Sequence, residues 1–511
     1  MSVPARCAVL VVGGGPGGSY AAAVLAREGV DVVLLEAEVF PRYHIGESML
    51  ASMRYFLRYI DLEDAFDNHG FEKKFGATFK ITAKREAYTD LRYFLGDGGH
   101  VWNTVCSEAD ELMFRHAEKC GALVFDGTKV NELEFTPYED KDFPTDPKVA
   151  NTGRPVSATW SRKDGSSGKI NFDYIIDASG CAGLISTKYL KNRTLNEGLK
   201  NIANWAYWKG AAPYSEGTPR QSSPFFEAFE IMRQDIFFGK KKLAGSPSSV
   251  EHYKECIKLA PQILKLLEKA ETVSDIKQAA DWSYSAPAYA GPHYRLAGDA
   301  GCFIDPYFSS GVHLAITSGL SAAMTIQAVR RGDCNEFTAA KWHSNKVTEG
   351  YTRFLLVIMT VLRQVRQQSR NLLSTEDEEG FDTAFKFIRP VIQGTADADM
   401  SNKHTREEVA SGVKFAPSTF KEATPEQQGI VIGKVQHDSH GSAELEKLNE
   451  DEVQFLHNII GKQAPLNLES FAKDIEGWTP VLQQGSLGLA RSDASNGSNG
   501  MVDLLDLKGS I

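Results

Sequence analysis

The sequence predicts an α/β (α+β) fold that opens with a Rossmann-like domain and continues into an antiparallel sheet and a helical region. An apolar segment, Cys7–Val12, runs into a glycine-rich turn, and a second one, Asp31–Leu35, ends on Glu36. Two further apolar segments end on Asp177 and on Asp299. Apolar strands that end on glycine or an acid beside a helix start are typical of open, mostly parallel sheets.

The glycine-rich turn has a physical role for each of its main residues. Gly13 makes a tight turn, Gly15 lets the backbone approach a pyrophosphate, and Gly18 lets the helix pack on the strand. Phosphates would lie at the helix N-terminus, where free N–H groups favour anions, and Glu36 would accept from ribose hydroxyls. The spacing predicts a dinucleotide site, with an ordinary βαβ turn as the alternative. The glycines of the predicted site are Gly13, Gly14, Gly15, Gly17 and Gly18.

A second cluster decides between two dinucleotides. The segment Tyr294–Cys302 resembles a short strand that ends at Gly298-Asp299 and is followed by a helix start. A carboxylate at Asp299 can bind the hydroxyls of a ribityl chain, which a nicotinamide cofactor lacks. Asp is also favoured as a helix N-cap, and both roles are compatible. We therefore expect FAD.

Bulk properties exclude several classes of function. The chain has 511 residues, enough for two or three domains, and a net charge of −10. Without a basic stripe, we expect no nucleic-acid partner. Seven scattered cysteines without CxxC pairs predict neither disulfides nor a metal site, and favour a reducing, cytoplasmic location. We see no signal peptide, and the longest apolar run, Phe354–Leu362, is too short to span a membrane.

Hydrophobic spacing divides the chain into elements and domains. Helices are predicted over residues 49–67, 108–120, 248–271 and 312–330. Strands are predicted over residues 75–82 and 98–105. The predicted FAD-binding domain is discontinuous and consists of residues 1–75, 106–190 and 285–335. The predicted substrate-binding sheet region consists of residues 76–105 and 191–284. A helical region is expected over 336–483 and a flexible tail, rich in Ser, Gly and Asn, over 484–511.

The loop Pro41–Ser48 carries a family resemblance. Together with Gly13–Gly18 and Asp305–Gly311, this loop resembles the flavin-dependent halogenases, and most closely the fungal enzymes that chlorinate phenolic secondary metabolites such as polyketides. The resemblance runs from Met1 to about residue 490. It implies the flavoprotein hydroxylase type of fold, a small aromatic substrate, and FAD used as FADH2 together with O2 and chloride.

One lysine carries the chemistry in that family, within a Gly-Phe-x-x-Lys-x-Gly-Ala segment. Here the segment is Gly70–Ala77, and Lys74 matches. Lys73 is the alternative, and without the resemblance either residue would be interpreted as a solvated surface lysine. By resemblance, a flavin hydroperoxide oxidises chloride to hypochlorous acid, and Lys74 directs the electrophilic chlorine to one ring carbon.

The resemblance also assigns roles around the flavin. The amides of Ser310 and Gly311 are expected to hold chloride, and Val312 to touch the flavin; an ordinary helix cap is the alternative. Glu47 matches an acid that couples the flavin and substrate sites, with a loop salt bridge as the alternative. We see no nicotinamide site, so a separate flavin reductase is expected as a partner. The arginines expected to contact FAD are Arg42 and Arg115, and a solvated helix arginine is the alternative for Arg115.

One family signature is missing. No Trp-x-Trp-x-Ile-Pro segment occurs, and the chain passes from Phe229-Glu230 to Ile231 where relatives would carry it, as though about two strands, roughly twenty residues, were absent. Either an intron was assigned wrongly or the gene lacks the segment. Cys181 also replaces a common arginine. A phenol monooxygenase and an inactive member of the family are therefore alternative functions.

Overall fold

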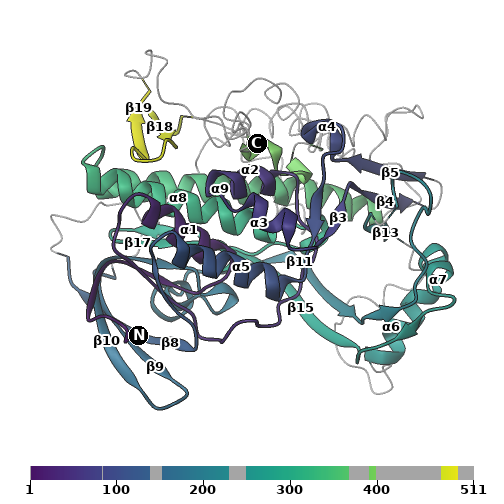
Figure 1. Cartoon of the computed structure of the whole chain (residues 1–511), viewed down its shortest axis with the longest axis horizontal. Helices are drawn as coiled ribbons and strands as arrows, with labels where there is room; N and C mark the ends of the chain where they lie inside the picture. The colour runs from purple at the N-terminus through teal and green to yellow at the C-terminus, as the bar shows by residue number, and fades with distance from the viewer. Residues whose placement is uncertain are drawn as a thin grey trace, which may run out of the picture.

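The computed structural model describes residues 2–82, 85–138, 152–221, 223–228, 249–366, 389, 391–398 and 474–492. The central sheet of the fold is mostly parallel, and its labelled strands lie at the lower left of Figure 1. Its strand order is β16-β17-β10-β1-β2-β7, with the antiparallel pair β8–β9 attached to β10. The strands are β1 (Arg6–Val12), β2 (Val32–Leu35), β7 (Leu123–Phe125), β8 (Thr128–Thr136), β9 (Arg154–Arg162), β10 (Ser167–Asp177), β16 (Ala290–Gly291) and β17 (Tyr294–Leu296).

The central strands are apolar because both faces of the sheet are covered. All four residues of β2 are buried, and Val9, Leu10 and Val11 of β1 are fully buried although they point to alternate faces. Continuous apolar runs of this kind are typical of parallel strands that lie between two layers. The prediction of a mostly parallel α/β core is thus confirmed.

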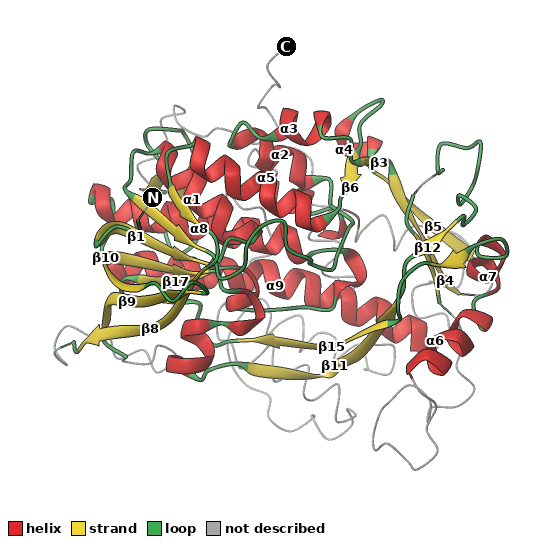
Figure 2. Ribbon diagram, turned by 60° about the horizontal axis from the view of Figure 1, so that its bottom comes forward, coloured by secondary structure: helices red, strands yellow, loops and turns green. Residues whose placement is uncertain are grey.

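Three helices cover one side of the sheet (Figure 2). They are α1 (Pro16–Arg27), α8 (Gly311–Arg331) and α9 (Glu336–Arg366). A Cβ atom on Gly319 of α8 would collide with the carbonyl of Gly17 of α1, so the two glycines allow the helix backbones to approach closely. Among the described residues, α8 is long and apolar enough to cross a membrane, but 83% of its apolar window is buried inside the fold.

The described residues form further helices, and buried residues of Cys106–Lys119 share one core with α1 and α8. These helices are α2 (Ser52–Tyr59), α3 (Glu63–Asn68), α4 (Arg92–Leu95), α5 (Cys106–Lys119), α6 (Ser249–Lys258), α7 (Pro261–Leu266) and α11 (Thr395–Ala398). The single helices predicted over 49–67 and 248–271 are each split in two. Asp61 adopts a positive φ of 59° between α2 and α3, and Pro261 starts α7 because proline cannot continue α6.

Smaller strand groups stand apart from the central sheet. β3 (Glu72–Lys74) pairs with β6 (Val101–Asn103), and β13 (Phe225–Glu227), β4 (Gly76–Thr82) and β5 (Arg85–Asp90) form a three-stranded sheet. The long ribbon β11 (Thr194–Trp205)–β15 (Lys277–Ser285) extends toward α6 and α7 (Figure 1). The pair β12 (Trp208–Lys209)–β14 (Glu271–Thr272) continues this ribbon. The prediction of a strand over 98–105 is correct only for β6.

The C-terminal part departs from the prediction. β18 (Trp478–Val481) and β19 (Gly488–Arg491) form a hairpin against the end of α8. Leu487 and Leu489 are buried in the main core, which explains why a segment of flexible composition is ordered. The expectation of a flexible tail is therefore wrong for 484–492, and that of a helical region up to 483 is wrong for β18. The missing-signature position at 229–235 and most of the range 367–473 lie outside the described residues.

Candidate active site

Parallel pairing brings the three predicted ligand-binding clusters to one edge of the sheet. Val12 pairs with both Leu35 and Asp177, and Asp177 pairs with Leu296. The glycine turn, Glu36, Asp177 and the Gly298-Asp299 turn therefore lie at or just after the carboxyl ends of four neighbouring strands. Ligands of open α/β sheets bind outside this edge.

The glycine turn has the shape that the sequence predicts. Gly13 adopts φ +103°, and a Cβ atom there would meet the carbonyl of Ala178, so only glycine fits. The amide of Gly14 donates to Oε2 of Glu36 at 2.6 Å. A Cβ atom on Gly18 would meet the carbonyl of Gly13 and the Ala178 side chain, so this glycine keeps α1 against the strand ends. Glu36, which is buried, thereby faces the turn as a ribose-binding acid would.

Gly15 and Arg42 form a cradle whose space and charge would suit a pyrophosphate. A Cβ atom on Gly15 would touch only Nη2 of Arg42, at 3.4 Å, so the space above the turn is open apart from this guanidinium. Arg42 Nη1 lies 3.0 Å from Asp110 Oδ2, and its Nε lies 3.9 Å from Glu36 Oε1. A guanidinium beside the free amides of a helix N-terminus fits a phosphate group. The residues at this end of the site thus fit FAD.

Asp110 is a residue that the sequence analysis missed. It lies on the buried face of α5, between Ala109 and Met113, and orients Arg42. Burial raises the pKa of Asp110, and Arg42 opposes this shift. The signal in the sequence was an acid at a position where helical spacing expects an apolar side chain.

The two acids at the ends of β10 and β17 have different surroundings. Asp177 is fully buried, and its carboxylate accepts from the amides of Ser179 and Ile185, so it organises the turn after β10. Asp299 is half-buried in a 3₁₀ turn, and the Cys181 thiol lies 3.7 Å from its Oδ2. Burial raises the pKa of Asp299. The ribityl role of Asp299 stays a prediction.

The turn that precedes α8 fits a small anion. Ser309 adopts φ 56° after a 3₁₀ turn over Pro306–Phe308, and α8 begins at Gly311. Among the described residues, the buried hydroxyl of Ser310 has no hydrogen-bond partner, and no atom lies within 4 Å of the position of a Cβ atom on Gly311. Val312 packs partly against the core. An unpartnered hydroxyl and the first free amides of a long helix are suitable donors for a halide. We call Ser309–Val312 the halide turn.

Lys74 is buried directly beneath the loop Pro41–Ser48. It ends β3, where it pairs with Val101, and is only 5% exposed. Its Nζ donates to Ser48 Oγ and to the carbonyl of Met49, both at 2.7 Å. Burial lowers the pKa of Lys74 to about 7, and no carboxylate forms an ion pair with it among the residues described. The same loop carries Arg42 at its other end, so it connects the phosphate cradle to the lysine.

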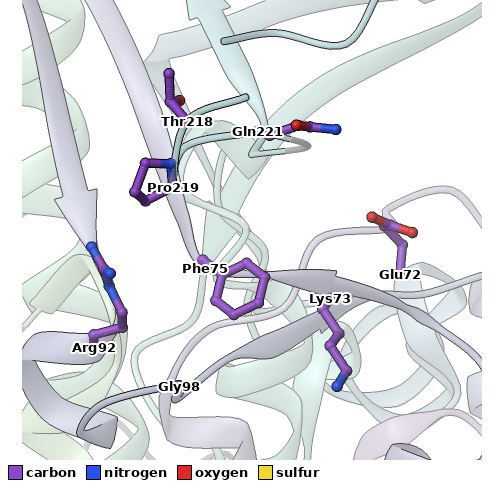
Figure 3. Close-up of a pocket in the computed structure, with 8 residues that line it drawn as sticks. All are labelled: Glu72, Lys73, Phe75, Arg92, Gly98, Thr218, Pro219 and Gln221. Atoms are coloured by element: carbon purple, nitrogen blue, oxygen red, sulfur yellow. The ribbon is translucent and has the colours of Figure 1, made fainter. Parts of the chain in front are cut away.

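Lys73 points away from this environment. It is exposed on β3 and lines an open cavity of about 360 Å³ with residues of two other segments (Figure 3). The residues that line the cavity are Glu72, Lys73, Phe75, Arg92, Gly98, Thr218, Pro219 and Gln221. Alternation along β3 thus separates the two lysines that the sequence alone could not distinguish.

Glu47 and Arg115 occupy less decisive positions. Glu47 is exposed on the loop, and its carbonyl accepts from the Thr104 amide at 2.6 Å. The hydrogen bond between the hydroxyls of Tyr207 and Tyr43 raises the pKa of Tyr207, and burial and the Glu47 carboxylate add to this shift. Arg115 donates to Asp126 Oδ2 at 2.9 Å on the surface of α5. Their proposed roles at FAD therefore stay predictions.

Comparison with known proteins first defines the class. Residues 6–200 match the model of the FAD binding domain family. The chain is thus an FAD-dependent protein, and the prediction of FAD is confirmed.

The comparison with curated proteins then defines the family. Sulochrin halogenase gedL of Aspergillus terreus is 60% identical, over 100% of this chain and 98% of the relative. Flavin-dependent halogenase ptaM of Pestalotiopsis fici is 58% identical, over 96% of each chain. The chain belongs to the flavin-dependent halogenases, enzymes that use reduced FAD, O2 and chloride on small aromatic substrates. The alternative of a phenol monooxygenase is not favoured.

Solved structures agree on the fold. The flavin-dependent brominase Bmp2 superimposes with a TM-score of 0.64 at 20% identity, over 82% of this chain and 98% of that chain. The flavin-dependent halogenase CmlS superimposes with a TM-score of 0.60 at 24% identity, over 89% and 77%.

The alignment with the Aspergillus relative contains gaps in this chain. It spans 540 positions, whereas the whole chain has 511 residues, so at least 29 positions of the alignment have no residue here. This agrees with a segment that relatives have and this chain lacks.

The first prediction tests the pyrophosphate cradle. Gly15→Val should leave the protein folded, because only the flexible end of Arg42 lies near the new side chain, but it should abolish FAD retention by filling the cradle. Bound flavin is measured by its visible absorbance after gel filtration. Gly350→Ala, in α9, is the matched control with an ordinary 3.5 Å contact, and it should retain FAD. A fully loaded Gly15→Val protein would contradict the assignment.

The second prediction concerns the buried amine. The folded protein releases the Lys74 proton near pH 7, whereas the unfolded chain keeps it up to about 10.5, so the unfolded state binds more protons in this window and stability rises with pH. From about pH 7.5 to about pH 9.5, the unfolding free energy of the wild type should rise by about 2.5 kcal/mol more than that of Lys74→Met. Urea unfolding at both pH values measures this. Lys73→Met, at an exposed site, is the control, and its unfolding free energy should rise between the two pH values as much as that of the wild type.

Proposed function

We propose that this enzyme chlorinates a phenolic ring of a polyketide-type secondary metabolite and that Lys74 is its catalytic residue. The observation that carries the proposal is the buried amine of Lys74, which has two oxygen acceptors and no acidic partner among the described residues. Strongly perturbed lysines without an ion pair are more typical of reactive sites than of structural ones. The 60% identity to an enzyme named sulochrin halogenase supports a phenolic substrate.

The bound flavin supplies the oxidising chemistry, and the residues of this chain bind and position the reactants. Arg42 and the α1 amides hold the phosphates, and Glu36 accepts from the ribose. Glu47, Arg115, Asp299 and Val312 complete the flavin contacts. The amides of Ser310 and Gly311 hold chloride, together with the Ser310 hydroxyl, which has no hydrogen-bond partner in the part of the chain that the structure describes. This arrangement needs no metal, because N–H dipoles suffice to hold a halide.

Lys74 has the properties needed to direct electrophilic chlorine. With a pKa of about 7, its amine is partly neutral at physiological pH and can accept chlorine, while its protonated form can donate a hydrogen bond to hypochlorous acid. Burial keeps the amine away from water, and the bonds to Ser48 and Met49 fix its direction. Regiochemistry then follows from how the phenol is held relative to this one nitrogen.

Two further features complete the proposal. A separate flavin reductase supplies FADH2, because the sequence shows no nicotinamide site. The enzyme works in the cytoplasm: none of the seven cysteines, all of which lie in the described part of the chain, forms a disulfide.

The third prediction tests the reaction. The protein, supplied with FAD, a flavin reductase, NADH, O2 and a phenolic substrate such as sulochrin, should give a product whose mass reflects replacement of hydrogen by chlorine. Mass spectrometry should show the chlorine isotope pattern only when chloride is present. A product that gains oxygen without chlorine would identify a monooxygenase. Retained FAD with neither product would indicate an inactive member of the family.

The fourth prediction tests the lysine. Lys74→Ala should abolish chlorination while FAD binding and release of hydrogen peroxide remain, because oxidation at the flavin does not involve the amine. Loss of a group that acts only in the reactive step typically lowers the rate by about a thousandfold. Lys73→Ala is the matched control and should keep most of the activity. If Lys73→Ala is inactive and Lys74→Ala is active, the role belongs to Lys73.

A further inference from the structure

Behind the halide turn lies a buried polar cluster that the reaction described above does not use. His313, two residues after Gly311 in the first turn of α8, is fully buried. Its Nδ1 is hydrogen-bonded to Ser52 Oγ at 2.8 Å, and its Nε2 to Asp397 Oδ2 at 3.0 Å. Arg353 Nη2 lies 2.8 Å from the other oxygen of Asp397. We call these four residues the His313 cluster.

The cluster connects two places that are far apart in the chain. Ser52 begins α2, and only two residues separate it from Met49, whose carbonyl accepts from Lys74. His313 therefore joins the helix turn that would hold chloride to the segment that holds the catalytic amine. The connection is the direct side-chain hydrogen bond between Ser52 of α2 and His313 of α8.

Both ring nitrogens of His313 form hydrogen bonds, and these two bonds fix the orientation of the ring. Burial favours the neutral form of Asp397, but Arg353 and His313 outweigh it and hold the pKa of that carboxyl well below its usual range. An ionised carboxylate can only accept, and Nε2 of His313 therefore carries the hydrogen of this bond. The His313 ring also packs between two aromatic rings. The distance between ring centroids is 5.8 Å to Phe56 and 5.6 Å to Phe354.

The backbone around the cluster is also fitted to the Ser52–His313 bond. Gly394 adopts φ +68°, and a Cβ atom there would collide with Ser52 Oγ and lie 2.8 Å from His313 Nδ1. The amide of Ser52 donates to the carbonyl of Gln393, the residue before Gly394, at 3.1 Å. The segment that supplies Asp397 thus also fixes the start of α2.

We propose that His313, held by Ser52 and Asp397, is a positioning residue that fixes the halide turn relative to Lys74. Its effect is to keep the site where chloride is oxidised aligned with the amine that uses the resulting hypochlorous acid. The inference rests on the proposed function, because it takes the halide turn and Lys74 as the two reacting sites. Misalignment by about 1 Å between reacting groups is enough to lower rates by up to a hundredfold.

The chain offers a matched control for this bond. On the same helix α8, Ser321 Oγ is hydrogen-bonded to Nδ1 of His343 at 2.9 Å, and both residues are fully buried. Nε2 of His343 is bonded to the carbonyl of Leu296 at 3.0 Å. Ser52→Ala and Ser321→Ala therefore each remove one buried Ser–His hydrogen bond from α8, and only the first bond reaches the Lys74 segment.

The experiment compares these two variants as FAD-loaded full-length protein. One readout is the fraction of reduced flavin that yields chlorinated product instead of hydrogen peroxide. The second readout is chloride affinity, from titration of the absorbance of bound oxidised FAD. Ser52→Ala should lower the product fraction about tenfold and weaken chloride binding, whereas Ser321→Ala should match the wild type in both. The midpoint temperature of thermal unfolding should fall by the same amount in the two variants. Equal readouts for the two variants would overturn the proposal.

Two further variants test whether Ser52 and Asp397 act through the same His313 ring. Asp397→Asn should lower the product fraction in the same direction, and the double variant with Ser52→Ala should be no worse than the stronger single one, because both act through one ring. Additive losses would contradict a common route through His313. Lys74→Ala should lose product but keep wild-type chloride affinity. If the wild type itself makes no chlorinated product, the proposed function fails, while the chloride titration of Ser52→Ala against Ser321→Ala still tests the role of His313.

Discussion

The close crossing of α1 and α8 is the constraint on which the rest of the site depends. Gly17 and Gly319 carry no side chains, so the two backbones approach to a distance that any Cβ atom would prevent. This contact brings the N-terminus of α8 beside the glycine turn, and the Gly298-Asp299 turn packs on Ala315 of the same helix. The phosphate end and the halide end of the site are therefore positioned by one helix pair.

A second connection carries this geometry to the lysine. The loop Pro41–Ser48 begins at the phosphate cradle with Arg42 and ends on Ser48, which accepts from Lys74. The loop itself is largely exposed, and it is held by its ends: Arg42 through Asp110, and Ser48 and Met49 through β6 and Trp102. The contacts at the two ends of this exposed loop therefore determine where the amine lies relative to Arg42 and the glycine turn.

Local patterns predicted the parts of the site that depend on neighbouring residues. The glycine turn, Glu36 and the strand ends could be predicted because βαβ spacing fixes their relation within the first thirty-six residues. Lys74 could be separated from Lys73 only by pairing along β3. The His313–Ser52 bond joins residues 261 positions apart, and no spacing rule reaches that far. The hairpin β18–β19 was missed because its order comes from packing of Leu487 and Leu489 against the core, not from its composition.

The environment of Lys74 is hard to explain by stability alone. A pKa lowered from 10.5 to about 7 means that the buried ammonium destabilises the fold by about 5 kcal/mol at low pH, a large part of the stability of an ordinary domain. A methionine at this position would fill the same space without that penalty. The neighbouring Lys73 is exposed, so β3 also presents a lysine to water. Burial of the amine beside the loop Pro41–Ser48 is what the proposed role of Lys74 would require, because that reaction needs an amine that is neither fully charged nor fully hydrated.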